Sequence, residues 1–249
     1  MSSQGFEGQV AVVTGAARGL GFSLSTLLAE RGARVFMVDR EGATLERAAH
    51  TLASRSLHVH AATADAASET DLRALRHRIE ADAKGRLDVL INNAGGWRYG
   101  SLSEITVADW DWTFEVNLKT VFLATRTLMD LMVARRYGRI VNIASTDAYR
   151  PKVKLPHYAA AKAAVVSLTK SMAEELAPHN VLVNAVSPGA IATETAKSQG
   201  WLAERIPQIP VRRAAEPEDI AEVALFLASP RNRFVVGETI VANGGMLMV

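Results

Sequence analysis

The sequence predicts an α/β fold in which one doubly wound parallel sheet of about seven strands is covered by helices on both faces. Short β-branched runs alternate with longer stretches of helical period, which is typical of repeated βαβ units. The chain has 249 residues, of which 49% are hydrophobic and 22% charged, and no linker or low-complexity tract divides it. We therefore expect a single domain over residues 1–249.

The elements follow in order along the chain. Strands are expected at residues 10–14, 34–38, 57–62, 88–91, 139–144, 181–186 and 239–242. Helices are expected at residues 18–32, 43–54, 69–84, 110–135, 158–177 and 217–228. Pro217 suits a first helical turn, because its missing N–H is unpaired there in any case. Residues 190–215 are irregular and are interpreted either as a mobile flap over a site or as a surface loop with a small helix.

Composition excludes several classes of protein. The net charge is only +2 with both signs interspersed, which does not indicate nucleic-acid binding. No apolar run approaches the length of a membrane span, and the first ten residues lack a secretion signal, so we expect a cytoplasmic protein. Cysteine is absent, and His58 and His60 have no evident third partner, so no metal site is expected.

A glycine-rich turn follows the first predicted strand and leads directly into a helix. Its residues 14–21 read TGAARGLG and include Gly15, Arg18, Gly19, Leu20 and Gly21. Small residues allow close approach of a ligand, and free N–H groups at a helix start favour an anion such as a diphosphate. The alternative is a tight strand-to-helix connection without a ligand.

Asp39 supplies the context for this turn. It ends the second predicted strand, 24 positions after Gly15, close to the spacing of an acidic residue that bonds an adenosine ribose. A carboxylate there repels a 2′-phosphate and favours NAD over NADP. Arg18 and Arg40 argue the other way, because either guanidinium could hold that phosphate. We expect NAD(H), with NADP(H) as the alternative.

Tyr158 and Lys162 lie four positions apart in a predicted helix, which places the phenol and the ammonium on one face. A neighbouring cation favours the phenolate, so the pair could act as an acid/base near neutral pH. Ser145 follows another strand and could reach the same site. Taken alone, the spacing of Tyr158 and Lys162 could be incidental, and Ser145 could be a turn residue. His157 is expected at the rim of the pocket.

Together these features resemble the short-chain dehydrogenase/reductase family, over nearly the whole chain. The further motifs are Asn92-Asn93-Ala94-Gly95, Asn117, Tyr158-Ala159-Ala160-Ala161-Lys162 and Pro188-Gly189. The resemblance implies that Tyr158 exchanges a proton with the substrate oxygen and that Ser145 holds that oxygen. It implies that Lys162 bonds the nicotinamide ribose and lowers the pKa of the phenol. Asn117 would hold a water that links Lys162 to solvent.

The resemblance also implies further cofactor contacts and an assembly. Asp65 and Ala66 would lie at the adenine, Asn93 beside a ribose, and Ile191 and Thr193 at the carboxamide. The remaining motif residues at the cofactor are Ala94, Gly95, Pro188 and Gly189. Family precedent implies a homotetramer built through helices 110–135 and 158–177 and the C-terminal strand region.

Two narrower resemblances compete. The C-terminal residues and the Tyr158 helix look like bacterial 3-oxoacyl-carrier-protein reductases, which usually take NADPH and lack an acid at the position of Asp39. Their basic docking pair is half matched, by Arg136 but with His179 in the second place. Residues 38–40 look more like NAD-linked alcohol and dihydrodiol dehydrogenases. We therefore expect an NAD(H)-dependent oxidoreductase on a secondary alcohol and its ketone; the alternatives are the NADPH-dependent 3-oxoacyl reductase and a nucleotide-sensing protein without turnover.

Three loops are expected to supply the wall of the substrate site: the loop after Gly95, the loop after Ser145 and the segment around residues 190–210. Aromatic and apolar candidates are Trp97, Tyr99, Tyr149, Val153, Leu155 and Trp201, and neighbouring cations are Arg98, Arg150, Lys152 and Lys154. An apolar, aromatic or alicyclic small molecule with an acidic group would suit both sets. The alternative is that the aromatic residues pack the loops and that the cations are solvated or serve a subunit contact.

Overall fold

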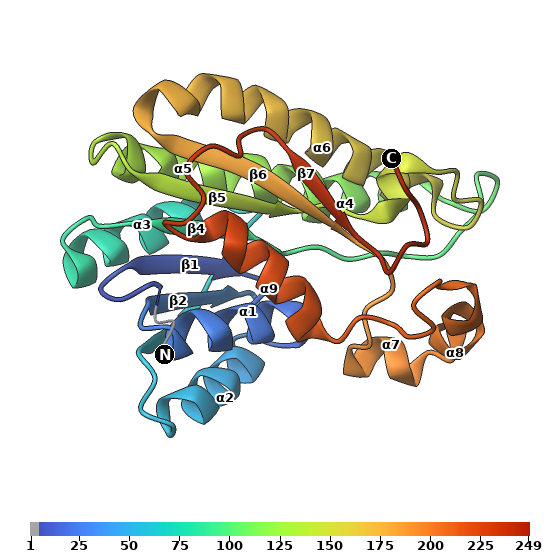
Figure 1. The fold of residues 1–249 in the computed structure, drawn as a ribbon, viewed down its shortest axis with the longest axis horizontal. Coiled ribbons are helices and arrows are strands. Elements are labelled where there is room, and N and C mark those ends of the chain that lie inside the picture. The colour runs from blue at the N-terminus through green and yellow to red at the C-terminus, as the bar shows by residue number, and fades with distance from the viewer. Residues whose placement is uncertain (1–4) are drawn as a thin grey trace.

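The sheet has seven strands, all parallel, in the order β3-β2-β1-β4-β5-β6-β7 (Figure 1). The structure is a computed structural model and describes residues 5–249. The strands are β1 Val10–Thr14, β2 Arg34–Asp39, β3 Val59–Thr63, β4 Val89–Asn92, β5 Gly138–Ile143, β6 Val181–Pro188 and β7 Thr239–Ala242. The predicted fold class is confirmed, and most strand ends lie within two residues of their predicted positions.

Helices cover both faces of this sheet, because successive strand residues point to opposite sides. Val13 packs in the core with α1, α2 and α9, whereas Val12 packs in the core with α3, α5 and α6. Figure 1 shows α6 and α9 on opposite sides of the strands. The covering helices are α1 Gly19–Glu30, α2 Gly42–Ala53, α9 Pro217–Ala228, α3 Glu69–Ala83, α5 Thr120–Val133 and α6 Pro156–Leu176.

The long helix predicted at 110–135 is not continuous. It begins earlier, as α4 Val107–Phe114, where Thr106 and Asp109 form a capping box, and a π-helical turn at Glu115–Lys119 separates it from α5. The sequence prediction was wrong here because apolar period alone does not report a widened turn inside a helix. Segment 190–215 contains two short helices, α7 Glu194–Ser198 and α8 Trp201–Arg205.

The order of the strands positions the site. The chain runs outward from β1 through β2 to β3, then returns to place β4 on the other side of β1. Such a reversal opens a crevice at the carboxyl ends of the two central strands, which is where ligands of doubly wound sheets bind. The carboxyl ends of β1 and β4 therefore flank this crevice, and the end of β5 lies next to that of β4.

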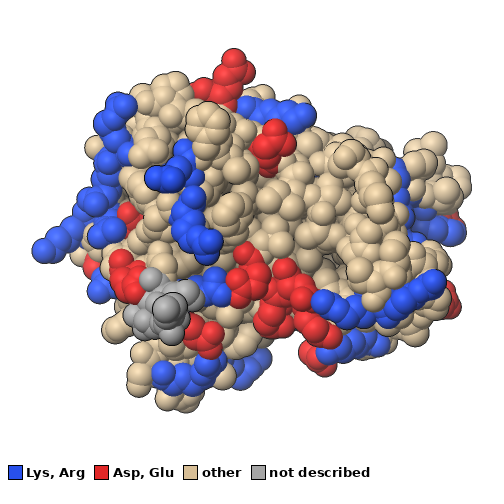
Figure 2. Space-filling view, viewed as in Figure 1, with Lys and Arg blue, Asp and Glu red and all other residues tan. Residues whose placement is uncertain are grey.

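Both charge signs are present on the face of the molecule that Figure 2 draws. Figure 2 shows Lys and Arg interspersed with Asp and Glu over one face, and an uncharged expanse over β7 and the C-terminal residues. Within residues 5–249, no helix is both long and apolar enough to span a membrane.

Candidate active site

Hydrogen bonds join the glycine-rich turn to the end of β4. Thr14 Oγ1 accepts from the backbone N–H groups of Asn93 and Ala94, both at 3.0 Å. The Asn93 side chain donates back to the carbonyls of Thr14 at 3.0 Å and Gly15 at 3.1 Å. The two strand ends flanking the crevice therefore form one rigid unit.

The turn leaves no room for side chains at its glycines. Gly15 has φ +65°, and a Cβ there would lie 2.9 Å from the Ala94 Cα. At Gly21, a Cβ would collide with the Gly15 carbonyl. Helix α1 begins directly after Arg18, whose side chain makes no capping hydrogen bond, and its first turn contains no acid. Its N–H groups are thus available to an anion such as a diphosphate.

A groove of about 640 Å³ runs along this turn, and we call it the nucleotide groove. It is lined by thirteen of the residues predicted to bind the cofactor: Gly15, Arg18, Gly19, Leu20, Gly21, Asp39, Arg40, Asp65, Ala66, Asn93, Ala94, Gly95 and Thr193. Thr193, at the start of α7, lies opposite the turn, since a Cβ on Gly19 would come within 3.3 Å of its methyl group. The residues present fit a dinucleotide.

Asp39 ends β2 with its carboxylate held in place. One oxygen accepts from the Ala17 N–H at 3.1 Å and the other from the Glu41 N–H at 3.0 Å. Arg18, a candidate for holding a 2′-phosphate, forms an ion pair with Glu41. Glu41 was missed by the sequence analysis, although its position two residues beyond Asp39 places it at the same strand end. Asp39 and Glu41 thus share this end of the groove with Arg18 and Arg40.

A second space of about 430 Å³, the catalytic cavity, contains the four predicted catalytic residues Asn117, Ser145, Tyr158 and Lys162. It shares five lining residues with the nucleotide groove: Leu20, Asn93, Gly95, Trp97 and Thr193. Pro188, Gly189 and Ile191 line it as well. The groove and the cavity are therefore parts of one continuous cleft.

Lys162 and Ser145 are held firmly beside Tyr158. The Lys162 side chain is buried, donates to the Ile143 carbonyl at 2.8 Å, and places Nζ 5.8 Å from the Tyr158 ring centroid. Ser145 Oγ accepts from the Asp147 N–H at 3.1 Å. Because that bond uses an oxygen lone pair, the Ser145 hydroxyl can also donate its proton, to Tyr158 or to another group in the cavity.

In the free protein burial dominates the pKa of Tyr158, and the part that Lys162 plays in stabilising the phenolate stays a prediction. Burial raises the pKa of Tyr158 to about 12, with the Ser145 hydroxyl acting in the opposite direction and the Asp147 charge adding to the increase. Burial also lowers the pKa of Lys162 to about 8. Desolvation disfavours both charged forms, and the ammonium donates to a carbonyl instead of the phenol oxygen. At neutral pH Tyr158 is therefore a neutral phenol.

Asn117 lies in the π-helical turn. Its amide donates to the carbonyls of Gly96 at 2.7 Å and Thr113 at 2.9 Å, and its oxygen accepts from the Gly96 N–H at 3.2 Å. A Cβ on Gly95 would meet Asn117 Oδ1 at 2.7 Å and Lys162 Nζ at 3.5 Å. Asn117 thus joins the loop after β4 to the helix and lies beside the lysine.

The structure brings only some of the predicted substrate residues to the catalytic cavity. Trp97 and Trp201 line the catalytic cavity, and Trp97 lies edge-on to Tyr158 with ring centroids 6.4 Å apart. Arg98 does not line it: its guanidinium bonds Asp109 at 2.9 Å and stacks on Trp112. Tyr149 is not among the lining residues either.

Other neighbours of the site also differ from expectation. His157 is fully buried and lies off the cavity, not at its rim. Lys154 pairs with Glu104 at 3.7 Å outside the cavity, whereas Arg150 and Lys152 do line it. Arg205 of α8 lines it too and was missed, because nothing in the pattern of an irregular segment shows which side chain turns inward. Residues 5–249 contain no cluster of acids and histidines suited to a metal ion.

Comparison with known proteins identifies the class. A glycine-turn groove opening into a tyrosine–lysine cavity is typical of nicotinamide-dependent oxidoreductases on doubly wound sheets. A family model described as "Enoyl-(Acyl carrier protein) reductase" matches residues 15–247. The chain belongs to the short-chain dehydrogenase/reductase family, and is thus an oxidoreductase acting on CH–OH groups with NAD or NADP.

The similar proteins differ in their named substrates. The chain is 36% identical to the 3-oxoacyl-(acyl-carrier-protein) reductase FabG of Aquifex aeolicus, covering 96% of this chain and 98% of that protein. It is 34% identical to the 2,3-dihydro-2,3-dihydroxybenzoate dehydrogenase of Bacillus subtilis, covering 98% of each. A solved 3-oxoacyl-(acyl-carrier protein) reductase from Brucella melitensis with bound NAD has a TM-score of 0.90 and 31% identity, covering 100% of this chain and 94% of that one.

Proposed function

We propose that this chain, as one catalytic domain, interconverts a secondary alcohol and its ketone with NAD(H), on an apolar aromatic or alicyclic small molecule. The observation that carries the proposal is the continuous cleft that leads from the groove beside Asp39 to Ser145, Tyr158 and Lys162. Bound NAD(H) would accept or supply the hydride there. The protein supplies the proton and the contacts that hold the substrate oxygen.

The catalytic roles follow from the protonation states. In reduction, Ser145 donates its hydroxyl proton as a hydrogen bond to the carbonyl oxygen, and the neutral phenol of Tyr158 transfers its proton to that oxygen. The resulting phenolate is stabilised by the ammonium of Lys162. In oxidation, the phenolate accepts the alcohol proton. Asn117 keeps the loop after β4 against the helix, and in this proposal it also holds a water beside Lys162.

Asp39 and Glu41 support the preference for NAD. The Asp39 carboxylate is oriented by two backbone N–H groups, so it is ready to accept from ribose hydroxyls and would repel a 2′-phosphate. The Arg18 guanidinium is already paired with Glu41 and would have to exchange partners to hold that phosphate. Arg40 remains as the other nearby cation.

A fluorescence titration with NADH and NADPH tests the cofactor preference. We expect NADH to bind at least about tenfold more tightly, because one unfavourable charge contact of roughly 1.4 kcal/mol corresponds to that factor. Tighter binding of NADPH would contradict it. Turnover of cyclic secondary alcohols with NAD, followed by NADH absorbance, then tests the reaction itself.

The second candidate function is an NADPH-dependent 3-oxoacyl reductase. It is favoured by the FabG relative and by Arg136, which lies at the same corner as His179 and donates to the Pro178 carbonyl at 3.1 Å. Because a structural neighbour named as a 3-oxoacyl reductase holds NAD, the cofactor alone does not separate the candidates. Faster turnover of a 3-oxoacyl thioester than of ring alcohols would favour this second function.

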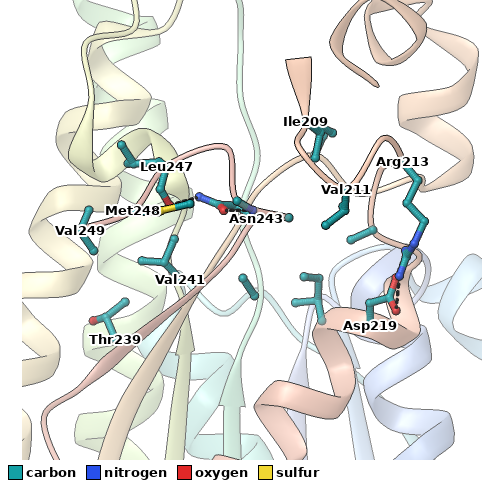
Figure 3. Close-up of a pocket in the computed structure, with 16 residues that line it drawn as sticks. Ile209, Val211, Arg213, Asp219, Thr239, Val241, Asn243, Leu247, Met248 and Val249 are labelled. Carbon is teal, nitrogen blue, oxygen red and sulfur yellow. Dashed lines mark hydrogen bonds and ion pairs between the residues drawn. The ribbon is translucent and has the colours of Figure 1, made fainter. Parts of the chain in front are cut away.

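We also propose a homotetramer, supported by apolar surface at the two expected interfaces. Figure 3 shows Val241, Leu247, Met248 and Val249 on one side of an open pocket of about 590 Å³. Met248 is 84% exposed, and Phe122 on α5 is also exposed. A second copy of the chain would cover such surface. Analytical ultracentrifugation should show a tetramer at micromolar concentration, and a monomer would contradict this assembly.

A further inference from the structure

Three cationic side chains converge on the catalytic cavity from separate parts of the chain. Arg150 and Lys152 follow Ser145 on the loop before α6, and Arg205 comes from α8. Arg150 and Lys152 keep only a quarter of their side-chain surface exposed. Burial, assisted by the charges of Arg205 and Arg150, lowers the pKa of Lys152. The three groups are thus close enough to influence one another.

The carboxylates around this cluster do not match its charge. Asp147 Oδ1 serves two cations, lying 3.2 Å from Arg150 Nε and 3.4 Å from Lys152 Nζ. Within the described part of the chain, Arg205 forms no ion pair. Glu204 lines the cavity as well, but its side chain is exposed and pairs with none of the three cations. Partly buried like charges repel one another unless an anion joins them, so the cluster is incomplete without one.

The cluster is also connected to the reacting position. Asp147, which orients Arg150 and Lys152, donates its backbone N–H to Ser145 Oγ at 3.1 Å. Trp97, Tyr99 and Trp201 line other parts of the same cavity. A ligand that reaches Ser145 and also the cations must therefore be short, since the whole cavity measures about 430 Å³ and includes the nicotinamide end.

We propose that Arg150, Lys152 and Arg205 bind an anionic group, a carboxylate or a phosphate, on a small apolar substrate whose alcohol or ketone carbon lies at Ser145 and Tyr158. This inference rests on the proposed function and names its substrate class. Arg150 and Arg205 present planar donor groups suited to the two oxygens of such an anion, and Lys152 adds a point charge. Arg98 and Lys154 have no part in it.

Calorimetric titration of three ring compounds tests the proposal without requiring turnover. The probes are benzoate, phenyl phosphate and the neutral benzamide, each titrated into the protein with and without NADH. At least one anion should bind about tenfold or more tightly than benzamide, because hydrogen bonds to charged groups are worth roughly 1.5–3 kcal/mol. The tighter of the two anions identifies the acidic group.

Matched variants locate the binding. R150A and R205A should each reduce the preference for the anion severalfold, and the double variant should bring it to within about a factor of two. K154A removes a cation of the same loop whose partner lies outside the cavity, and it should leave the preference unchanged. Unchanged NADH affinity and thermal unfolding temperature in each variant show that the cleft is intact.

Either of two binding results would overturn the inference, namely benzamide binding as tightly as both anions or a preference for the anions that survives in the double variant, and so would a third. The third is failure to bind any probe. These outcomes are separable from failure of the proposed function, which would appear as absent NADH binding or absent turnover of both neutral and anionic ring alcohols. A protein that binds NADH and oxidises neutral alcohols but ignores the anions would retain the function and lose this inference.

Discussion

The two ends of the cleft are built in different ways. At the nucleotide groove, ligand-facing residues lie at or directly after strand ends, and side-chain-to-backbone hydrogen bonds such as those between Thr14 and Asn93 hold them. At the substrate end, side chains come from the loop after β5 and from α8, and they meet through charge pairs around Asp147. Parallel pairing brings the carboxyl ends of the strands to one edge of the sheet, so spacing along the chain predicts which residues line the nucleotide groove. No comparable rule places the residues of the substrate end.

The largest effect is expected where the two ends meet. Tyr158→Phe removes the only proposed proton donor but keeps the ring against Trp97, so turnover should fall about a thousandfold, within the range of general acid catalysis. NADH affinity, measured by fluorescence titration, should stay within a factor of about two. Undiminished turnover would remove Tyr158 from the mechanism.

One added methyl group should be enough to weaken cofactor binding at the rigid nucleotide groove. Gly15→Ala places a Cβ 2.9 Å from the Ala94 Cα, and NADH affinity should fall at least about tenfold, since overpacking costs roughly 1–3 kcal/mol. Gly200→Ala is the matched control, because Gly200 also has positive φ but has nothing within 4 Å. Both variants carry backbone strain; equal NADH affinities would show that crowding at the turn is unimportant.

The charges beside Asp39 allow a further test of how the nucleotide groove selects its cofactor. Asp39→Ser removes the charge that opposes a 2′-phosphate and leaves Arg18 and Arg40 in place, so the ratio of NADPH to NADH affinity should rise about tenfold. Glu41→Gln should raise the same ratio by a smaller factor, because it releases Arg18 from its ion pair. An unchanged ratio in both variants, measured by parallel titrations, would show that other residues select the cofactor.

The smallest effect concerns the substrate end. The charge of Asp147 raises the pKa of Tyr158, so Asp147→Asn should lower that pKa while keeping the backbone bond to Ser145. Oxidation requires the phenolate, so the oxidation rate of the variant should begin to rise at a pH up to about one unit below that of the unmodified protein. Rates across a pH series check this, with Lys154→Ala as a control that should not shift. A shift to higher pH would contradict the assigned sign.

Residue order alone predicted much of the active site. Seven strands, the glycine turn, Asp39 and the Tyr158–Lys162 pair were all named from spacing, and the structure places these residues along one cleft. The reason is that helical and strand periods are local, and that parallel strands bring their carboxyl ends to one edge.

Only the tertiary structure determined which charged groups pair with one another and in which direction the side chains point. It placed Arg98 on Trp112 and away from the cavity, turned Arg205 inward and paired Arg18 with Glu41. Burial also raises the pKa of Tyr158, an effect that the spacing of Tyr158 and Lys162 does not express. Burial and long-range pairing depend on which surfaces are packed together, and a linear sequence does not express either one.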